Sequence, residues 1–139
     1  MLILDTNHYS EIIERRPIGL RLEQRLQASK EDAFLIIITP EESLKGWLAA
    51  IQPHRQADSG VRAYREFQDS ISTLGEWTIL PWTDDAVMIF QALRTRGVRI
   101  GSMDLRIASI ALEYDATLLS RNLRDFRQVP ELRVENWLD

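Results

Sequence analysis

Short apolar runs alternate with longer amphipathic stretches along this chain, and the alternation predicts strands separated by helices. A run that is apolar without interruption and rich in β-branched residues is typical of a strand buried on both faces. Residues 34–38 are the clearest example. Further strands are expected over residues 2–4, 77–80, 117–119 and 132–134.

The segments between these runs place apolar residues at the spacing of one helix face. The first predicted helix ends before Pro17, and the second is marked by Leu20, Leu22 and Leu26. Further helices are expected from residue 40 onward and over residues 61–74, 84–97 and 103–114.

In the helix over residues 61–74, the side chains of Tyr64, Phe67 and Ile71 are expected to share one face. Two helix starts carry a polar capping residue, namely Thr39 and Ser102, and Pro40 suits the first helical position. Glu42 follows Thr39 at the spacing of a capping box, in which a glutamate bonds back to the backbone of the N-cap residue. The sequence therefore offers Glu42 a purely structural role.

Strands that are separated by helices imply a mostly parallel sheet with helices on both faces. The fold class expected is therefore α/β. A length of 139 residues, with no repeat and no linker, predicts a single domain over residues 1–139.

Composition narrows the possible chemistry. Apolar residues make up 45% of the chain and charged residues 27%, which excludes a mainly disordered protein. The chain contains no cysteine, so disulfides, zinc–thiolate sites and thiol nucleophiles are excluded. Its net charge of −4 argues against binding nucleic acid through charge alone. No signal peptide and no membrane span are expected, and a cytoplasmic location is the prediction.

Acidic residues stand where several of the predicted elements begin or end. Asp5 directly follows the strand over residues 2–4, Glu42 follows the strand over residues 34–38, and Asp104 lies at the start of a helix. Ligands of open α/β sheets bind at the carboxyl ends of the strands. Carboxylates that meet there repel one another unless a cation neutralises them. A hard divalent metal ion acting on a phosphate ester is the simplest chemistry that uses such a cluster.

Three stretches resemble the PIN-domain ribonucleases, specifically the VapC-type toxins of bacterial toxin–antitoxin modules. They are Leu4-Asp5-Thr6-Asn7, then the segment from Thr39 to Gly46 with its Thr, Glu and Gly spacing, and then the segment from Ile100 to Trp137. The last segment includes Gly101-Ser102-Met103-Asp104, Asn122, Asp125-Phe126 and Glu135-Asn136-Trp137. Each piece is weak alone, and their order and spacing together make the resemblance specific.

The resemblance implies a PIN-like three-layer α/β fold and a metal-dependent endoribonuclease. Asp5, Glu42 and Asp104 match the acidic positions of the family, with Asp5 and Asp104 as the metal ligands. Asn122 stands where many members have aspartate, and Asp125 follows it, so both belong to the expected catalytic set. The implied cofactor is Mg²⁺, with Mn²⁺ as the alternative. The implied partners are an RNA substrate and a cognate antitoxin, in a homodimer or a toxin–antitoxin hetero-oligomer.

Other interpretations remain open from the residues themselves. Asp5 could serve only as a helix cap, and an acid at the position of Asp104 is favoured by the helix dipole. Asn7 could hydrogen-bond Asp5 or only help to start the helix. His8 lacks a partnered nucleophile, so a surface or helix-start role is expected for it. Arg94, Arg96 and Arg99 could contact RNA phosphates or only favour a helix C-terminus.

Two rival functions follow from the same residues. Because Asn122 is neutral, the chain could be a catalytically silent PIN-fold module that binds RNA or protein. Asp5 could instead be the covalent nucleophile of a phosphatase, although such enzymes usually carry a second acid two residues later, where this chain has Asn7.

Overall fold

A five-stranded parallel sheet forms the centre of the molecule. The computed structural model describes residues 1–55 and 60–139. The strands lie in the order β3-β2-β1-β4-β5, and every neighbouring pair is parallel. Their bounds are β1 (Leu2–Leu4), β2 (Ala33–Ile36), β3 (Ile79–Leu80), β4 (Thr117–Leu119) and β5 (Arg133–Glu135). The predicted parallel α/β sheet is confirmed, with β1 at its middle.

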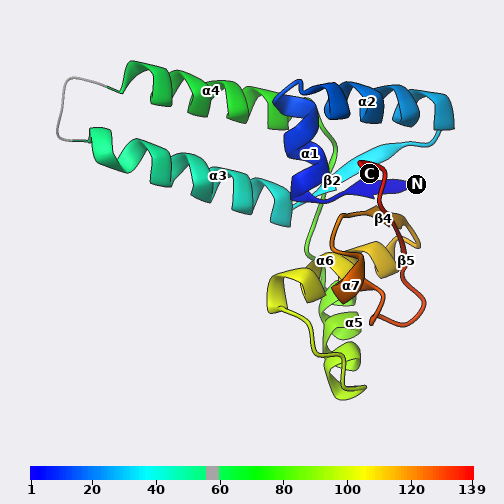
Figure 1. The fold of residues 1–139 in the computed structure, drawn as a ribbon. Coiled ribbons are helices and arrows are strands. Elements are labelled where there is room, and N and C mark those ends of the chain that lie inside the picture. Colours follow the sequence, from blue (N-terminus) through cyan, green and yellow to red (C-terminus); the bar gives the residue numbers. More distant parts are fainter. Residues whose placement is uncertain (56–59) are drawn as a thin grey trace.

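Helices cover both faces of this sheet, so the fold has the three layers that were expected (Figure 1). One layer contains α1 (Thr6–Ile13), α2 (Pro17–Ser29), α3 (Ile38–Ile51) and α4 (Val61–Gly75), with the short 3-10 helix η1 (Gln52–His54) after α3. The other contains α5 (Asp84–Thr95), α6 (Ser102–Glu113) and α7 (Leu123–Phe126). Within the described segments, no helix is both long enough and apolar enough to cross a membrane.

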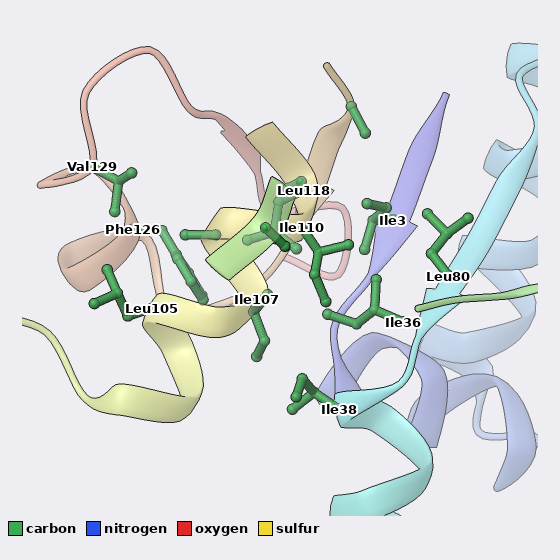
Figure 2. Close-up of a cluster of buried hydrophobic side chains, with 14 of the residues drawn as sticks. Ile3, Ile36, Ile38, Leu80, Leu105, Ile107, Ile110, Leu118, Phe126 and Val129 are labelled. Atoms are coloured by element: carbon green, nitrogen blue, oxygen red, sulfur yellow. The ribbon is translucent and has the colours of Figure 1, made fainter. Parts of the chain in front are cut away.

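The side chains of β1 alternate between the two faces of the sheet and so join both halves of the core. Ile3 belongs to a cluster with the α6 residues Leu105 and Ile110, drawn in Figure 2. Leu2 and Leu4 point to the opposite face, where they pack in a second cluster with Tyr9 of α1. All three residues of β1 are at most 1% exposed. Burial on both faces fixes the position of β1, and it therefore fixes Asp5 at its end.

Helices α1 and α2 pack closely because α2 has a glycine at the contact. A Cβ atom added to Gly19 would lie 1.9 Å from the carbonyl oxygen of Glu11. Only a residue without a side chain can occupy this position while the two helices keep their separation.

The second strand and the helix after it differ from the prediction. The strand expected over residues 34–38 ends at Ile36, and α3 already begins at Ile38. Ile37 has helical dihedral angles (φ −58°, ψ −21°) and occupies the N-cap position, so the prediction of Thr39 as N-cap is wrong. The physical reason is burial: Ile38 is 4% and Thr39 1% exposed, and the early turn brings both into the interior.

Three smaller expectations also change. Ser102 is the first residue of α6 and Gly101 is its N-cap, without a side-chain hydrogen bond, so the prediction of Ser102 as cap is wrong. The apolar face expected on α4 is partly in solvent, since Tyr64 and Ile71 are each 50% exposed. The polar break expected over residues 52–60 contains η1, and residues 56–59 lie outside the described part of the chain.

Candidate active site at the edge of the sheet

The predicted acidic residues meet in one cavity at the carboxyl ends of the central strands. Asp5 follows β1 and Ser120 follows β4, while Asp104 lies in the first turn of α6 and Glu42 directly after the first turn of α3. The cavity has a volume of about 160 Å³. Its lining consists of Asp5, Thr6, Asn7, Glu42, Asp104, Ile107, Ser120, Asn122 and Phe126. The expected convergence of Asp5, Glu42 and Asp104 is present in the structure.

Asp5 caps α1 and lines the cavity at the same time. Its Oδ1 accepts a hydrogen bond from the backbone N–H of His8 at 2.9 Å, which satisfies a free donor in the first turn of α1. The Nδ1 atom of His8 lies 3.0 Å from the same oxygen. Asp5 is only 7% exposed. The capping role and the cavity position of Asp5 are therefore compatible.

Glu42 is oriented by Thr6 and does not form the capping box that its spacing allowed. The Thr6 hydroxyl donates to Oε1 of Glu42 at 3.0 Å, and Thr39 is no longer at the N-cap. Partial burial raises the pKa of the Glu42 carboxyl above its usual value. The Thr6 hydrogen bond lowers this pKa, and the charges of Asp104 and Asp5 raise it. Glu42 is thus electrostatically coupled to both other acids of the cavity.

A single amide connects Asp104 to Asp125. The Nδ2 group of Asn122 donates to Oδ2 of Asp104 at 3.1 Å and to Oδ2 of Asp125 at 3.0 Å. The backbone N–H of Asn122 is bound in turn by the Ser120 hydroxyl at 3.0 Å. Burial and then the charge of Asp125 raise the pKa of Asp104, while the Asn122 amide lowers it and Asp5 raises it. Asn122 thus lines the cavity between two carboxylates, and Asp125 is joined to the cavity through the Asn122 amide.

The excess negative charge at this site suits a hard divalent cation. Among the described residues, no lysine or arginine forms an ion pair with Asp5, Glu42, Asp104 or Asp125. The side chains offer carboxylate and amide oxygens, which are the ligands that Mg²⁺ and Mn²⁺ prefer. As these side chains stand, no three acidic or histidine residues of the described chain lie close enough to hold one ion together.

The sequence interpretation missed three residues that organise the site, namely Thr6, His8 and Ser120. Thr6 and Ser120 each directly follow a strand end or its acid, which was an available signal. Of the surface and helix-start roles expected for His8, the surface role is wrong because His8 is fully buried, and it does lie in the first turn of α1. Asn7 lines the cavity but, within the described chain, donates no hydrogen bond to Asp5.

A larger hollow adjoins the acidic cavity, between α1, α3 and α4. It has a volume of about 360 Å³ and shares Thr6 and Glu42 with the acidic cavity. Its walls include Ile13, Gly46 and Trp47. Tyr9 also lines it, and its buried hydroxyl has no hydrogen-bond partner among the described residues. Burial, together with the charge of Glu76, raises the pKa of Tyr9 to about 12.

The chain matches the family model described as "PIN domain" over residues 2–132. A protein named Ribonuclease VapC2 from Haemophilus influenzae is 30% identical over 140 aligned residues, covering 98% of this chain and 97% of the relative. A Ribonuclease VapC2 from Rickettsia felis is 35% identical over 68 residues, which cover 46% of this chain and 51% of the relative.

Solved structures share the fold over nearly the whole chain. VapBC2 from Rickettsia felis, bound to a DNA fragment from its promoter, gives a TM-score of 0.72 at 25% identity and covers 98% of each chain. FitAcB from Neisseria gonorrhoeae gives a TM-score of 0.76 at 23% identity, covering 99% of this chain and 98% of that one.

Proposed function

This chain belongs to the PIN-domain family of VapC-type ribonucleases, and from that membership we propose that it is a metal-dependent endoribonuclease and the toxin of a toxin–antitoxin pair. The observation that carries this proposal is the meeting of Asp5, Glu42 and Asp104 in one cavity at the sheet edge. Three segments far apart in the sequence supply these acids, and no basic side chain of the described residues neutralises them.

In the proposed mechanism, Asp5 and Asp104 hold Mg²⁺ or Mn²⁺, directly or through water. Such an ion, when bound, supplies Lewis acidity toward the scissile phosphate and lowers the pKa of coordinated water. Asn122 holds the Asp104 carboxylate in place through its amide. Glu42, whose pKa is raised, is suited to accept a proton on Oε2, because Oε1 is occupied by Thr6. No protein nucleophile is required.

A cleavage assay with labelled RNA tests this function. We expect EDTA to stop cleavage and Mg²⁺ or Mn²⁺ to restore it, and we expect Asp5→Asn and Asp104→Asn to be inactive while remaining folded. Asp84→Asn is the matched control, because Asp84 is an exposed acid in the first turn of α5, away from the cavity. Full activity in EDTA or in Asp5→Asn would refute the metal mechanism.

The same experiments separate the rival functions. A silent binding module would cleave no RNA with any divalent ion, although it would keep its fold. A phosphatase would form a trappable phospho-aspartate on Asp5. The exposed Asn7 beside Asp5 carries no acidic proton donor for that reaction, which favours the nuclease.

The partner that we propose is an antitoxin that binds the hollow between α1, α3 and α4. Solved structures with this fold include VapBC2 and FitAB. Ile13 and Trp47 offer an apolar segment its contacts there, and Glu42 at the boundary offers a basic side chain of the partner an acceptor. Ile12 lines a separate hollow with Leu26 and Trp77.

Substitution of a glycine tests this surface. A Cβ atom added at Gly46 meets no atom within 4 Å, and Gly46 lines the hollow, so Gly46→Leu should fill part of the hollow, keep cleavage and resist the antitoxin. Gly75→Leu is the control, because its position is equally open but lies outside the hollow. Growth arrest on expression of the wild type, and none with Asp5→Ala, would support the toxin role. If neither protein arrested growth when expressed without a partner, the toxin role would be contradicted.

A further inference from the structure

His8 is completely buried, and both of its ring nitrogens have a partner. Its Nδ1 lies 3.0 Å from Oδ1 of Asp5, and the backbone N–H of Trp137 donates to its Nε2 at 3.3 Å. Trp137 is 129 residues away along the chain. A histidine on the first turn of α1 thus joins the proposed metal ligand to the segment that follows β5.

These two contacts determine which nitrogen carries the proton. A backbone N–H can only donate, so Nε2 must be the acceptor in its bond with Trp137. The imidazole is then neutral, with its proton on Nδ1, where it donates to Asp5. The hydrogen bond made by one ring nitrogen fixes the state of the other, as happens for histidines around metal sites.

The result for Asp5 is a carboxylate held by two donors on one oxygen. The backbone N–H and the Nδ1–H of His8 both reach Oδ1, at 2.9 and 3.0 Å. Two donors restrict rotation of the carboxylate and leave Oδ2 for a cation. A neutral ring also adds no positive charge that would compete with that cation.

Trp137, which bonds to His8, is itself held by contacts on two sides. The guanidinium of Arg25, on α2, lies 4.2 Å from the centre of the Trp137 ring. The indole N–H of Trp137 donates to Glu135 at 2.6 Å, and the carbonyl of Glu135 accepts from the backbone N–H of Ser120 at 2.9 Å. The Trp137 backbone is therefore fixed relative to β4 and to α2.

We infer that His8 is a positioning residue for Asp5, and that the segment through Trp137 fixes the His8 tautomer which this role requires. The inference rests on the proposed metal-dependent function and adds a residue that acts through Asp5. His8 itself contacts neither the ion nor the RNA, because it acts through Asp5.

Two substitutions separate the two bonds of His8. An asparagine side chain can place its amide nitrogen near the position of Nδ1, so His8→Asn keeps a donor for Asp5 and loses the bond to Trp137. A glutamine can place its oxygen near the position of Nε2, so His8→Gln keeps an acceptor for Trp137 and loses the donor to Asp5. Both variants lose one buried hydrogen bond, and a purely structural role predicts similar effects on both.

The measurement is the affinity for Mn²⁺, followed by electron paramagnetic resonance on folded full-length protein, with melting temperatures measured alongside. We expect His8→Gln to bind Mn²⁺ about 10- to 100-fold more weakly than the wild type, and His8→Asn to bind it more tightly than His8→Gln. Equal Mn²⁺ affinity of His8→Gln and wild type would overturn the inference alone. A wild type that binds no Mn²⁺ and cleaves no RNA would overturn the proposed function as well.

The tautomer can be tested on the unaltered protein without metal. The chain has only two histidines, so ¹⁵N spectra of the imidazole nitrogens are simple, and His54→Gln assigns them. We expect a neutral ring with its proton on Nδ1 for His8, and a changed Nδ1 shift in Asp5→Asn. A proton on Nε2 would overturn the inference even if no variant folded.

Discussion

Asn122 holds two carboxylates together with one amide group, and this makes it the most sensitive residue for testing the charge balance of the site. It donates to both Asp104 and Asp125. Asn122→Asp removes these donors and adds a negative charge, so the pKa of Asp104, already raised by burial and by Asp125, should rise further. A raised acid pKa means that ionisation costs stability, and the cost is present at neutral pH and disappears as the acids are protonated.

We therefore expect Asn122→Asp to lower the melting temperature of the metal-free protein near neutral pH. The loss should shrink as the pH falls toward the usual range of aspartate pKa values, about 4. Added Mn²⁺ should raise the melting temperature of the variant more than that of the wild type. Gln91→Glu adds the same charge on the exposed face of α5 and serves as control. The same loss in both variants would show that the effect is not specific to the site.

The role of Glu42 can be tested by comparing it with its neighbour Glu41. Glu42→Gln removes the charge and keeps an oxygen for the Thr6 hydroxyl, so we expect cleavage to fall by about 10²-fold or more. Because the folded-state pKa of Glu42 is raised, its ionisation costs stability as the pH rises from its usual value of 4.5 through the raised one. The metal-free variant should thus melt no lower than the wild type at neutral pH.

Glu41→Gln is the matched control, since Glu41 is exposed and pairs only with Lys45, at 3.5 Å, among the described residues. Its activity should stay close to that of the wild type. Retained activity in Glu42→Gln would remove Glu42 from the catalytic set and leave it as a structural residue.

The sequence predicted the acids that line the cavity better than the groups that form hydrogen bonds with them. Asp5, Glu42 and Asp104 stand at element ends, and the parallel sheet brings such ends to one edge. His8 could not be found in this way, because its importance comes from complete burial and from contact with Trp137, near the other end of the sequence. A local pattern contains no information about a contact of that separation.

At the scale of elements, the contact between α1 and α2 depends on Gly19. Gly19→Ala would place a Cβ atom 1.9 Å from the Glu11 carbonyl oxygen, so the two helices must separate or the protein must lose stability. We expect a loss of about 1–3 kcal/mol in the free energy of unfolding, measured by urea denaturation.

Gly46→Ala is the same chemical change as Gly19→Ala, but we expect it to increase the stability of the protein. Gly46 lies inside α3, and an added Cβ meets nothing within 4 Å. Alanine there should stabilise the protein by about 0.5–1 kcal/mol, because glycine is unfavourable within a helix. Destabilisation by both substitutions to the same extent would contradict the role assigned to the contact between α1 and α2.

The order and type of most elements followed from the apolar pattern, and their ends did not. Burial of Ile38 and Thr39 turned the chain into α3 before the residues with good capping chemistry were reached. Tertiary packing thus overrode a local capping preference.

At the scale of the whole molecule, metal binding should raise the free energy of unfolding. A ligand that binds only the folded state at about 100 times its Kd adds about 2.7 kcal/mol. For a domain of this size, that corresponds to a rise of roughly 10 °C in melting temperature. We expect Mn²⁺ to raise the melting temperature of the wild type by this amount. In Asp5→Asn and Asp104→Asn, most of this rise should be lost. Potassium chloride at matched ionic strength is the control, and an equal rise with it would indicate only screening of repulsion.

The central position of β1 also has a consequence for the order in which the protein is made. Leu2 and Leu4 of β1 are translated long before Thr117 and Leu119, their partners in β4. Asp104 and Asn122 arrive equally late. A nascent chain therefore carries Asp5 without the rest of the acidic cavity for most of its synthesis. The cavity can form only after the chain has been translated through Asn122 and Phe126, which also line it.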